Sequence, residues 1–357
     1  MINSKKYTRQ IALPEIGISG QEKLSNAKVL IIGAGGLGCP VLQNLAAAGV
    51  GSIGIVDGDS IEETNLHRQH LYTLNDCGKN KAEVALDAIS KLNPDIIITA
   101  YPCHFTSVNA LEMASSYQLI VDCTDTIATR YLINDVALIK GIPMVYASIH
   151  KFEGQLSVFN YHNGPSYRCL FPEPENSTPI SNCNDAGVLG VLSNTLGVLQ
   201  ATEVLKIILE IGEILSGKIL IYDGLYHKMQ TIDFKKNHIQ IEKGIQNGLS
   251  ISHAKEVGSI VAADFFETAN NAGNLIVDLR ESYEEPKLTL PNIQCVPVAE
   301  LESFLKDTDR NQKIILFCEH GNTSFLAANY LIKKEFQNVF HLKNGIKALQ
   351  EMNTNRL

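Results

Sequence analysis

The sequence predicts an α/β protein in which a doubly wound, mainly parallel sheet with an antiparallel extension precedes a second, smaller α/β domain. Short apolar runs alternate with helical stretches through the first part of the chain, which is typical of parallel strands joined by helices. A glycine-rich turn follows the first apolar run, and the α/β pattern starts again near residue 251. The length of 357 residues allows two or three domains of about 150 residues each.

The first elements are a strand, a turn, a helix and a second strand. Residues 28–33 indicate a buried strand, residues 40–48 an apolar helix and residues 52–57 the next strand, and together they make a βαβ unit. Further strands are expected at 96–100, 119–122 and 143–147, helices at 79–91 and 130–140, and antiparallel additions at 154–160 and 217–234. Residues 160–185, rich in Pro, Asn and Ser, predict a long loop of the kind that is often functional.

The second domain follows a stretch in which this pattern weakens. We expect the first domain to cover residues 1–243 and the second to cover residues 251–357. The sequence Gly-Ile-Gln-Asn-Gly-Leu-Ser at 244–250 predicts a linker between them. In the second domain, strands are expected at 275–279, 294–296, 314–318 and 339–342, and a helix near Ser324.

Composition and charge disfavour several classes of function. The formal net charge is −8 and neither half of the chain is basic, so a nucleic-acid surface has no electrostatic support. The longest apolar stretch, residues 188–211, predicts a buried helix or one at a subunit interface rather than a membrane span, because polar residues interrupt it. These are Asn194, Thr195, Gln200, Glu203 and Lys206. The eight cysteines show no Cys-x-x-Cys spacing and no signal peptide is expected, which favours a reduced cytoplasmic compartment.

A nucleotide site is predicted at the turn Gly33-Ala34-Gly35-Gly36-Leu37-Gly38. Glycines let the backbone turn tightly and approach phosphates, and the N-terminus of the following helix offers free N–H donors. Asp57 ends the next strand, where a carboxylate can accept hydrogen bonds from ribose hydroxyls. These residues predict a Rossmann-like nucleotide-binding unit, but they do not separate NAD from ATP.

The residues that follow favour ATP. Arg9, Arg68 and Lys81 can offset the charge of a triphosphate, and Asp125 can hold Mg²⁺ after the strand at 119–122. A dinucleotide dehydrogenase needs neither three cations nor a second acidic loop. An NAD-dependent oxidoreductase is therefore the less favoured alternative.

Seven short motifs lie between residues 5 and 235. They are Tyr-Thr-Arg-Gln (7–10), Gly-Ala-Gly-Gly-Leu-Gly-Cys-Pro (33–40), Asp-Gly-Asp (57–59), Thr-Asn-Leu-His-Arg-Gln (64–69), Asp-Cys-Thr-Asp-Thr (122–126), Tyr-Arg-Cys (167–169) and Cys-Asn-Asp-Ala-Gly-Val (183–188). With these motifs the chain resembles the ubiquitin-activating-like adenylyltransferases of molybdopterin and thiamine biosynthesis, the MoeB/ThiF/HesA type. The resemblance implies that the chain uses Mg²⁺ and ATP to adenylate the C-terminal Gly-Gly carboxylate of a ubiquitin-like sulfur carrier protein of the MoaD/ThiS type.

The resemblance also implies roles for individual residues. Catalytic roles are expected for Arg9, Arg68, Lys81, Asp125 and Cys183. Nucleotide contacts are expected at Gly33, Gly35, Gly36, Gly38, Asp57, Asp59, Thr64, Asn65, Arg68, Lys81, Asp125 and Thr126. Arg9 would come from the partner subunit of a homodimer, and Thr126 stands where the family usually has Asn but can still offer a hydroxyl. Cys183 could attack the acyl-adenylate or resolve an acyl disulfide.

Many members of this family carry a structural zinc ion held by two Cys-x-x-Cys pairs. Here Ser166 and Cys169 would form the first pair, with Ser in place of Cys. Residues 235–248, where the second pair is expected, contain no cysteine, and His238 is a lone candidate. Tetrahedral zinc requires four ligands, mostly Cys or His. We therefore predict no structural zinc.

The second domain places Cys318 at the end of an expected strand and before an expected helix, in the turn Cys-Glu-His-Gly-Asn-Thr-Ser. Backbone N–H groups in such a turn stabilise a thiolate and bind an anion. A tyrosine phosphatase would need Arg at the position of Ser324, so phosphatase activity is not expected.

Together with residues 277–281, 291–297 and 342–346, this turn makes residues 250–357 similar to the rhodanese (sulfurtransferase) domain. The resemblance implies a persulfide on Cys318. Asp278 and Arg280 are expected to form a structural pair. The turn lacks Arg, which disfavours thiosulfate as the sulfur donor, and a persulfide received from a cysteine desulfurase fits equally well.

The leading hypothesis is therefore a bifunctional enzyme that adenylates a sulfur carrier and presents sulfur on Cys318 to give a carrier thiocarboxylate. A carboxylate is already ionised near pH 7, so its attack on the α-phosphate needs no general base. It needs charge neutralisation and in-line positioning. The alternatives are an NAD-dependent oxidoreductase and a non-catalytic module that docks the carrier.

Overall fold

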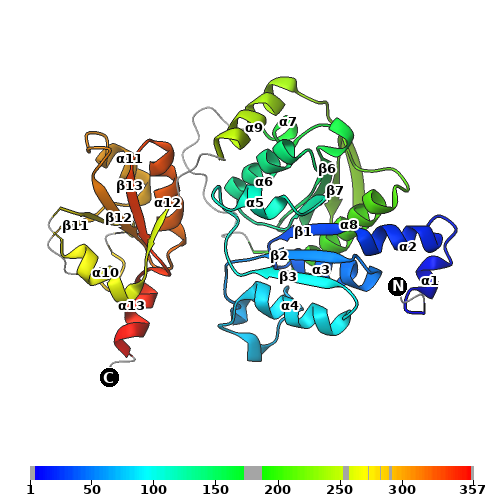
Figure 1. The fold of residues 1–357 in the computed structure, drawn as a ribbon, viewed down its shortest axis with the longest axis horizontal. Helices are drawn as coiled ribbons and strands as arrows, with labels where there is room; N and C mark the ends of the chain where they lie inside the picture. Colours follow the sequence, from blue (N-terminus) through cyan, green and yellow to red (C-terminus); the bar gives the residue numbers. More distant parts are fainter. Residues whose placement is uncertain are drawn as a thin grey trace. The chain divides into compact units, whose positions relative to one another are not determined.

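The chain folds into two compact units, Met1–Ser252 and His253–Leu357 (Figure 1). The computed structural model describes residues 5–172, 187–251, 257–271, 273–281, 283–288 and 292–354. Each unit is an α/β domain with its own sheet, which confirms the predicted fold class.

The first unit is built on an eight-stranded sheet in the order β3-β2-β1-β4-β5-β6-β7-β8. Its strands are β1 (Lys28–Ile32), β2 (Ser52–Val56), β3 (Ile97–Tyr101), β4 (Leu119–Asp122), β5 (Met144–His150), β6 (Glu153–Phe159), β7 (Lys218–Asp223) and β8 (Lys228–Asp233). Strands β1 to β5 pair in parallel, and β6, β7 and β8 add in antiparallel fashion. The strand order reverses between β1 and β4, and sheets of this kind bind ligands at that switch point.

Helices cover both faces of this sheet (Figure 1). They are α1 (Thr8–Ile11), α2 (Gly17–Asn26), α3 (Gly38–Ala48), α4 (Lys81–Leu92), α5 (Ala110–Ala114), α6 (Ile127–Lys140), α7 (Tyr167–Leu170), α8 (Gly190–Leu209) and α9 (His238–Ile251), with 3-10 turns η1 (Glu63–Asn65), η2 (Leu74–Asp76) and η3 (Tyr161–Asn163). Val29 and Ile31 lie in the core formed with α3, α4 and α8, whereas Leu30 and Ile32 lie in the core formed with α5 and α6. Because strand side chains alternate between faces, a strand buried on both faces has the continuous apolar run seen in the sequence.

Helix α8 contains the long apolar stretch. Among the described residues it alone is long and apolar enough to cross a membrane, a criterion that the core helix of a folded domain also meets. It packs on α3, β5 and β6. Its buried Gln200 side chain donates hydrogen bonds to the carbonyl oxygens of Asp122 (2.8 Å) and Val145 (3.4 Å). These contacts agree with the prediction of a buried helix.

Residues 244–250, predicted as a linker, belong instead to α9. This helix packs against α6 and α7. A Cβ atom at Gly248 would lie 2.4 Å from Cγ1 of Ile139 and 2.9 Å from the carbonyl oxygen of Asp135. Glycine is therefore required where α9 and α6 approach each other closely, and it does not break the chain there.

The second unit contains a five-stranded parallel sheet in the order β11-β10-β12-β13-β9. Its strands are β9 (Gly258–Ile260), β10 (Leu275–Asp278), β11 (Ile293–Cys295), β12 (Lys313–Phe317) and β13 (Asn338–Leu342), and its helices are α10 (Ala262–Ala269), α11 (Leu301–Phe304), α12 (Asn322–Lys333) and α13 (Gly345–Thr354), with a 3-10 turn η5 (Val298–Glu300). Leu316 lies in the core that includes α11 and α12, and Ile315 in the core that includes α10 and α13.

Candidate functional site

The glycine turn lies between β1 and α3, at the switch point of the first sheet. Gly33 has a φ of +96°, and a Cβ atom at Gly38 would lie only 2.1 Å from the carbonyl oxygen of Gly33. Both positions therefore exclude other residue types. No side chain in the described part of the chain caps α3, so N–H groups at its N-terminus are open to an anion.

Asp57 follows β2 and contacts the glycine turn directly. Its Oδ2 accepts a hydrogen bond from the Ala34 N–H (2.7 Å), and its Oδ1 accepts one from the Asp59 N–H (2.9 Å). Burial raises the pKa of the Asp57 carboxyl, although the nearby Lys81 ammonium opposes this shift. Each carboxylate oxygen can accept a second hydrogen bond, which leaves capacity for a ribose hydroxyl.

Lys81 is the first residue of α4, and its ammonium lies beside the same acidic turn. Its Nζ is 3.2 Å from Oδ2 of Asp59, and Lys81 is only 8% exposed. The Asn80 side chain caps α4 and also donates to the carbonyl oxygen of Asp57 (3.1 Å). This capping residue fixes the start of α4, and therefore Lys81, against the end of β2.

The segment 63–69 covers the other side of the glycine turn. Cγ of Arg68 lies 3.4 Å from the position of a Cβ at Gly36. Nη1 of Arg68 donates to the carbonyl oxygen of Thr64 (3.0 Å). Asn65 is buried, and its Oδ1 accepts from the backbone N–H of Glu62 (3.2 Å). The structure thus brings Arg68, Asp57, Asp59 and Lys81 to the turn, while Thr64 and Asn65 support the segment that carries Arg68.

The loop after β4 lies against the same turn. A Cβ at Gly33 would lie 2.7 Å from the carbonyl oxygen of Cys123. Asp125 is exposed two residues further on. Thr126 is the last residue before α6, and its hydroxyl donates to Oγ1 of Thr129 (2.7 Å). The Thr126 oxygen therefore keeps only its acceptor capacity for a ligand.

The second unit contains a different chemical feature, a cysteine in a cup of amides. Sγ of Cys318 accepts from the backbone N–H groups of Gly321 (3.2 Å) and Ser324 (3.4 Å) and lies 3.6 Å from Oγ of Ser324. Cys318 is 5% exposed. The backbone N–H of Ile346 donates to the Cys318 carbonyl (3.0 Å), so α13 braces the loop. This arrangement stabilises negative charge on sulfur.

Asp278 and Arg280 form the predicted pair in this unit. The guanidinium donates to both carboxylate oxygens at 3.0 and 2.8 Å. A third contact joins Nη1 of Arg280 to Oε2 of Glu319 at 3.4 Å. These hydrogen bonds raise the pKa of Arg280. Because Glu319 follows Cys318, the pair supports the loop structurally.

Comparison with known proteins gives both units a family. Residues 7–242 match the ThiF family, and residues 262–352 match the rhodanese-like domain. The chain belongs to the ThiF family. It is 36% identical to the adenylyltransferase and sulfurtransferase MOCS3 of Drosophila grimshawi, over 96% of this chain and 83% of that protein. It is 35% identical to the protein of the same name from Dictyostelium discoideum, over 97% and 94%.

The ThiF domain also has relatives of its own. It is 47% identical to the sulfur carrier protein adenylyltransferase of Thermus thermophilus, over 65% of this chain and 88% of that protein. Escherichia coli MccB has a solved structure with a TM-score of 0.58 and 23% identity, covering 67% of this chain and 74% of that one, which supports the fold alone. Family membership favours an ATP-using adenylyltransferase over an NAD-dependent oxidoreductase.

In the described residues, two of the predicted catalytic residues are not seen at the glycine turn. Arg9 lies on α1, which packs at the far end of α3: Gln10 donates to the Ala48 carbonyl (3.0 Å), and Asn93 donates to the Tyr7 hydroxyl (2.8 Å). The 11 residues of α3 span about 16 Å. Cys183 lies outside the described residues, so its role stays a prediction.

Two other cysteines next to the turn are buried thiols. Burial raises the pKa of the Cys39 thiol to about 12, and burial also raises the pKa of the Cys123 thiol. Nucleophilic attack by cysteine requires the thiolate. Neither thiol is therefore a candidate nucleophile in the ThiF domain.

Gln69 is a site residue that ends the motif at 64–69 but that the sequence pattern alone did not single out. It is 3% exposed, and its Nε2 lies 3.5 Å from the position of a Cβ at Gly35. Its buried Oε1 has no hydrogen-bond donor within the described residues. A buried amide oxygen without a partner is unfavourable, so this atom is available to a ligand. Only burial distinguishes Gln69 from a surface glutamine.

The position of the family's zinc does not fit a metal in this chain. Sγ of Cys169 accepts from the backbone N–H groups of Ser166 (3.4 Å) and Asn237 (3.3 Å). The described residues contain no group of three or more His, Cys, Asp or Glu side chains placed for a metal. One thiol among serine and backbone groups falls short of a tetrahedral ligand set. The hydrogen bond from the Asn237 N–H to Cys169 instead joins α7 to the start of α9.

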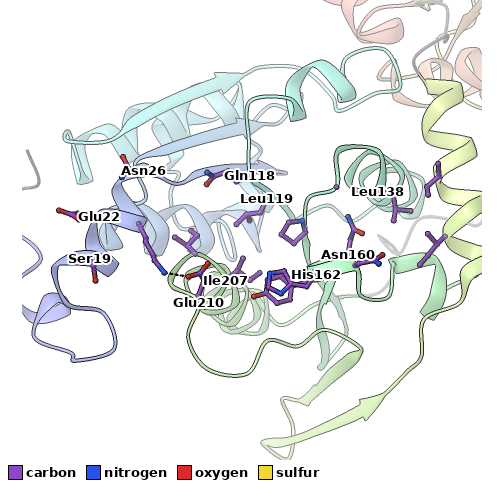
Figure 2. Close-up of a pocket in the computed structure, with 18 residues that line it drawn as sticks. Ser19, Glu22, Asn26, Gln118, Leu119, Leu138, Asn160, His162, Ile207 and Glu210 are labelled. Atoms are coloured by element: carbon purple, nitrogen blue, oxygen red, sulfur yellow. Dashed lines mark hydrogen bonds and ion pairs between the residues drawn. The ribbon is translucent and has the colours of Figure 1, made fainter.

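A large cavity of the ThiF domain lies away from this chemistry. Its volume is about 860 Å³, and it is lined by residues at the amino ends of the parallel strands, such as Asn26 and Gln118 (Figure 2). The Lys23–Glu210 ion pair stands at its wall (Figure 2). The glycine turn is at the carboxyl ends of the same strands, so this cavity is not the nucleotide site.

Proposed function

We propose that the glycine turn with Arg68 and Lys81 activates the C-terminal carboxylate of a ubiquitin-like sulfur carrier and that Cys318 supplies the sulfur. The chain is an ATP-dependent adenylyltransferase with a sulfurtransferase domain, as its family and relatives indicate. The observation that carries the proposal is that the Lys81 ammonium, beside Asp59, and the side-chain stem of Arg68, beside Gly36, flank the glycine turn that leads into the uncapped N-terminus of α3.

The first step is adenylation. A carrier carboxylate oxygen attacks the α-phosphorus of ATP, an O–P bond forms, and the bond to the bridging oxygen breaks, so that pyrophosphate leaves with the electron pair. The carboxylate is already ionised near pH 7. We propose that Lys81 and Arg68 offset charge on the phosphates. In support, Lys81 lies beside Asp59, and Cγ of Arg68 lies beside Gly36 of the glycine turn.

Asp125 is the residue that we propose for Mg²⁺. Magnesium in nucleotide sites is usually bound by one or two carboxylates together with phosphate oxygens and water. An exposed carboxylate in the loop beside the glycine turn fits that donor set.

The second step transfers sulfur. The terminal sulfur of a Cys318 persulfide attacks the acyl carbon and AMP leaves, which forms an acyl disulfide. A second thiol that attacks the Cys318 sulfur then releases the carrier thiocarboxylate and forms a disulfide. We propose Cys183 for this resolving role or for attack on the adenylate itself. In support, Cys183 precedes Gly190 by seven residues, and a Cβ at Gly190 would lie 2.4 Å from the carbonyl oxygen of His67.

The function is tested by ATP–pyrophosphate exchange. We expect labelled pyrophosphate to enter ATP when a carrier ending in Gly-Gly is added, with molybdopterin-type and thiamine-type carriers as candidates. A carrier without its last glycine is the matched control. With a persulfide donor such as a cysteine desulfurase, the carrier mass should rise by about 16 as sulfur replaces oxygen. Carrier binding without exchange would support a docking module instead.

We further propose that Arg9 reaches the site of a partner subunit in a homodimer. Its distance from the glycine turn along α3 supports this. Arg9→Ala and Lys81→Met should each lose exchange activity. When equal amounts of the two variants are dissociated and mixed, about half of the dimers should contain one subunit of each variant. Each mixed dimer has one complete site of two, so about a quarter of wild-type activity should return. Activity that stays at the level of the separate variants would contradict a role of Arg9 across the dimer.

A further inference from the structure

The loop that carries Asp125 is held in place by side chains to which neither the motifs nor the proposed reaction gives a role. The loop starts at Cys123, whose backbone N–H donates to the Ile32 carbonyl (2.9 Å), and ends at the N-cap of α6, Thr126. Asp125 is exposed in its middle. An exposed carboxylate binds a cation well only if its backbone is already fixed, because ordering it on binding costs entropy.

Asp122 holds this loop from the end of β4. It is fully buried, and its Oδ1 accepts from both the backbone N–H (3.0 Å) and the hydroxyl (2.8 Å) of Thr124. The Asp122 carbonyl accepts from Gln200 of α8 (2.8 Å). Burial raises the pKa of Asp122, with Arg130 opposing the shift. The residue before Asp125 is thus tied to the sheet.

Arg130 holds the same residue from the first turn of α6. Its Nη2 donates to the Thr124 carbonyl (3.0 Å), and its Nε lies 3.8 Å from Oδ2 of Asp122. Its guanidinium also lies 5.4 Å from the centre of the Tyr146 ring. The N–H, hydroxyl and carbonyl of Thr124 are therefore all bonded, by two buried and oppositely charged side chains.

We infer that Asp122 and Arg130 are positioning residues, which act through Thr124 to hold the Asp125 carboxylate where Mg·ATP needs it. This inference rests on the proposed function of Asp125. If Asp122, Arg130 and Thr124 had a purely structural role, changing them would weaken ATP binding equally with and without Mg²⁺. If they position Asp125, changing them weakens mainly the binding of ATP in the presence of Mg²⁺.

The test measures ATP binding to the full chain by calorimetry, with excess Mg²⁺ and with none. Thr124→Val removes the hydroxyl donor and keeps the side-chain shape. We expect it to weaken ATP binding about tenfold in Mg²⁺, the effect of one hydrogen bond to a charged group, and less than about twofold without Mg²⁺. Thr124→Ser should restore wild-type binding. Thr202→Val, which removes an exposed hydroxyl on α8, is the matched control.

A double variant separates this inference from the function on which it rests. If Thr124 acts through Asp125, Thr124→Val should add no further loss to Asp125→Asn. If Asp125→Asn alone leaves the magnesium dependence unchanged, the proposed role of Asp125 is wrong. If Asp125→Asn removes that dependence but Thr124→Val weakens ATP binding equally with and without Mg²⁺, or does not weaken it at all, the positioning inference is wrong. Should Thr124→Val not fold, Arg130→Met, which removes the donor to the Thr124 carbonyl, is expected to give the same pattern.

Discussion

Replacing Lys81 by methionine is expected to lower the rate of ATP–pyrophosphate exchange by about 10²- to 10³-fold, the usual effect of removing one group that stabilises developing charge in a buried site. Lys81 is 8% exposed and lies beside the carboxylates of Asp57 and Asp59. Without its ammonium, two acidic side chains would face the triphosphate. Methionine keeps most of the side-chain volume, so the change acts mainly on charge.

The chain offers a matched control two residues earlier. Lys79 is exposed and forms an ion pair with Asp76 at 2.9 Å, a type of contact worth about 0–1 kcal/mol. Lys79→Met should therefore keep exchange within about twofold of wild type. Lys81→Met should keep the wild-type circular dichroism spectrum and thermal unfolding curve, which would show that the ThiF domain of the variant is folded. Exchange near the wild-type rate in Lys81→Met would contradict its placement at the phosphates.

The strands were predictable because the chemistry that forms them is local. Residues such as Val29 to Ile32 are apolar on both faces, and a glycine turn or polar residues bound each run. The glycine turn itself was predictable because Gly33 needs a positive φ and Gly38 has no room for a Cβ. In these cases a property of one short segment decides both its structure and its position in the sheet.

Other parts depend on packing that the sequence does not display. The sequence around Gly248 predicts a linker, but Gly248 lies inside α9, where it allows close approach to α6. The sequence pattern assigns no individual role to Gln69 or Arg130. Their contacts in the structure show that Gln69 faces the glycine turn and that Arg130 bonds to the loop of Asp125. Arg9 belongs to the motif at 7–10, yet α1 packs at the end of α3 that is far from the glycine turn. Tertiary contacts decide such placements, and local sequence does not display them.

Replacing Cys318 by serine is expected to abolish sulfur transfer while leaving adenylation intact. The two amide donors at 3.2 and 3.4 Å would still bind an oxygen at this position, so the loop should keep its structure. Serine cannot carry a persulfide sulfur. We expect the mass increase of about 32 for a persulfide to be lost, and thiocarboxylate formation to fall at least about 10³-fold, as when a nucleophile is removed.

Cys295 provides the control within the same unit. It is an exposed free thiol on β11, so an unspecific thiol reaction would involve it at least as readily as the nearly buried Cys318. Cys295→Ser should therefore keep both the persulfide and the thiocarboxylate, and both variants should keep carrier-dependent exchange. If Cys295→Ser lost the persulfide and Cys318→Ser kept it, the sulfur would be carried by Cys295 on β11 and the prediction would be wrong. Because backbone amides donate to the sulfur of Cys318, we expect the opposite result.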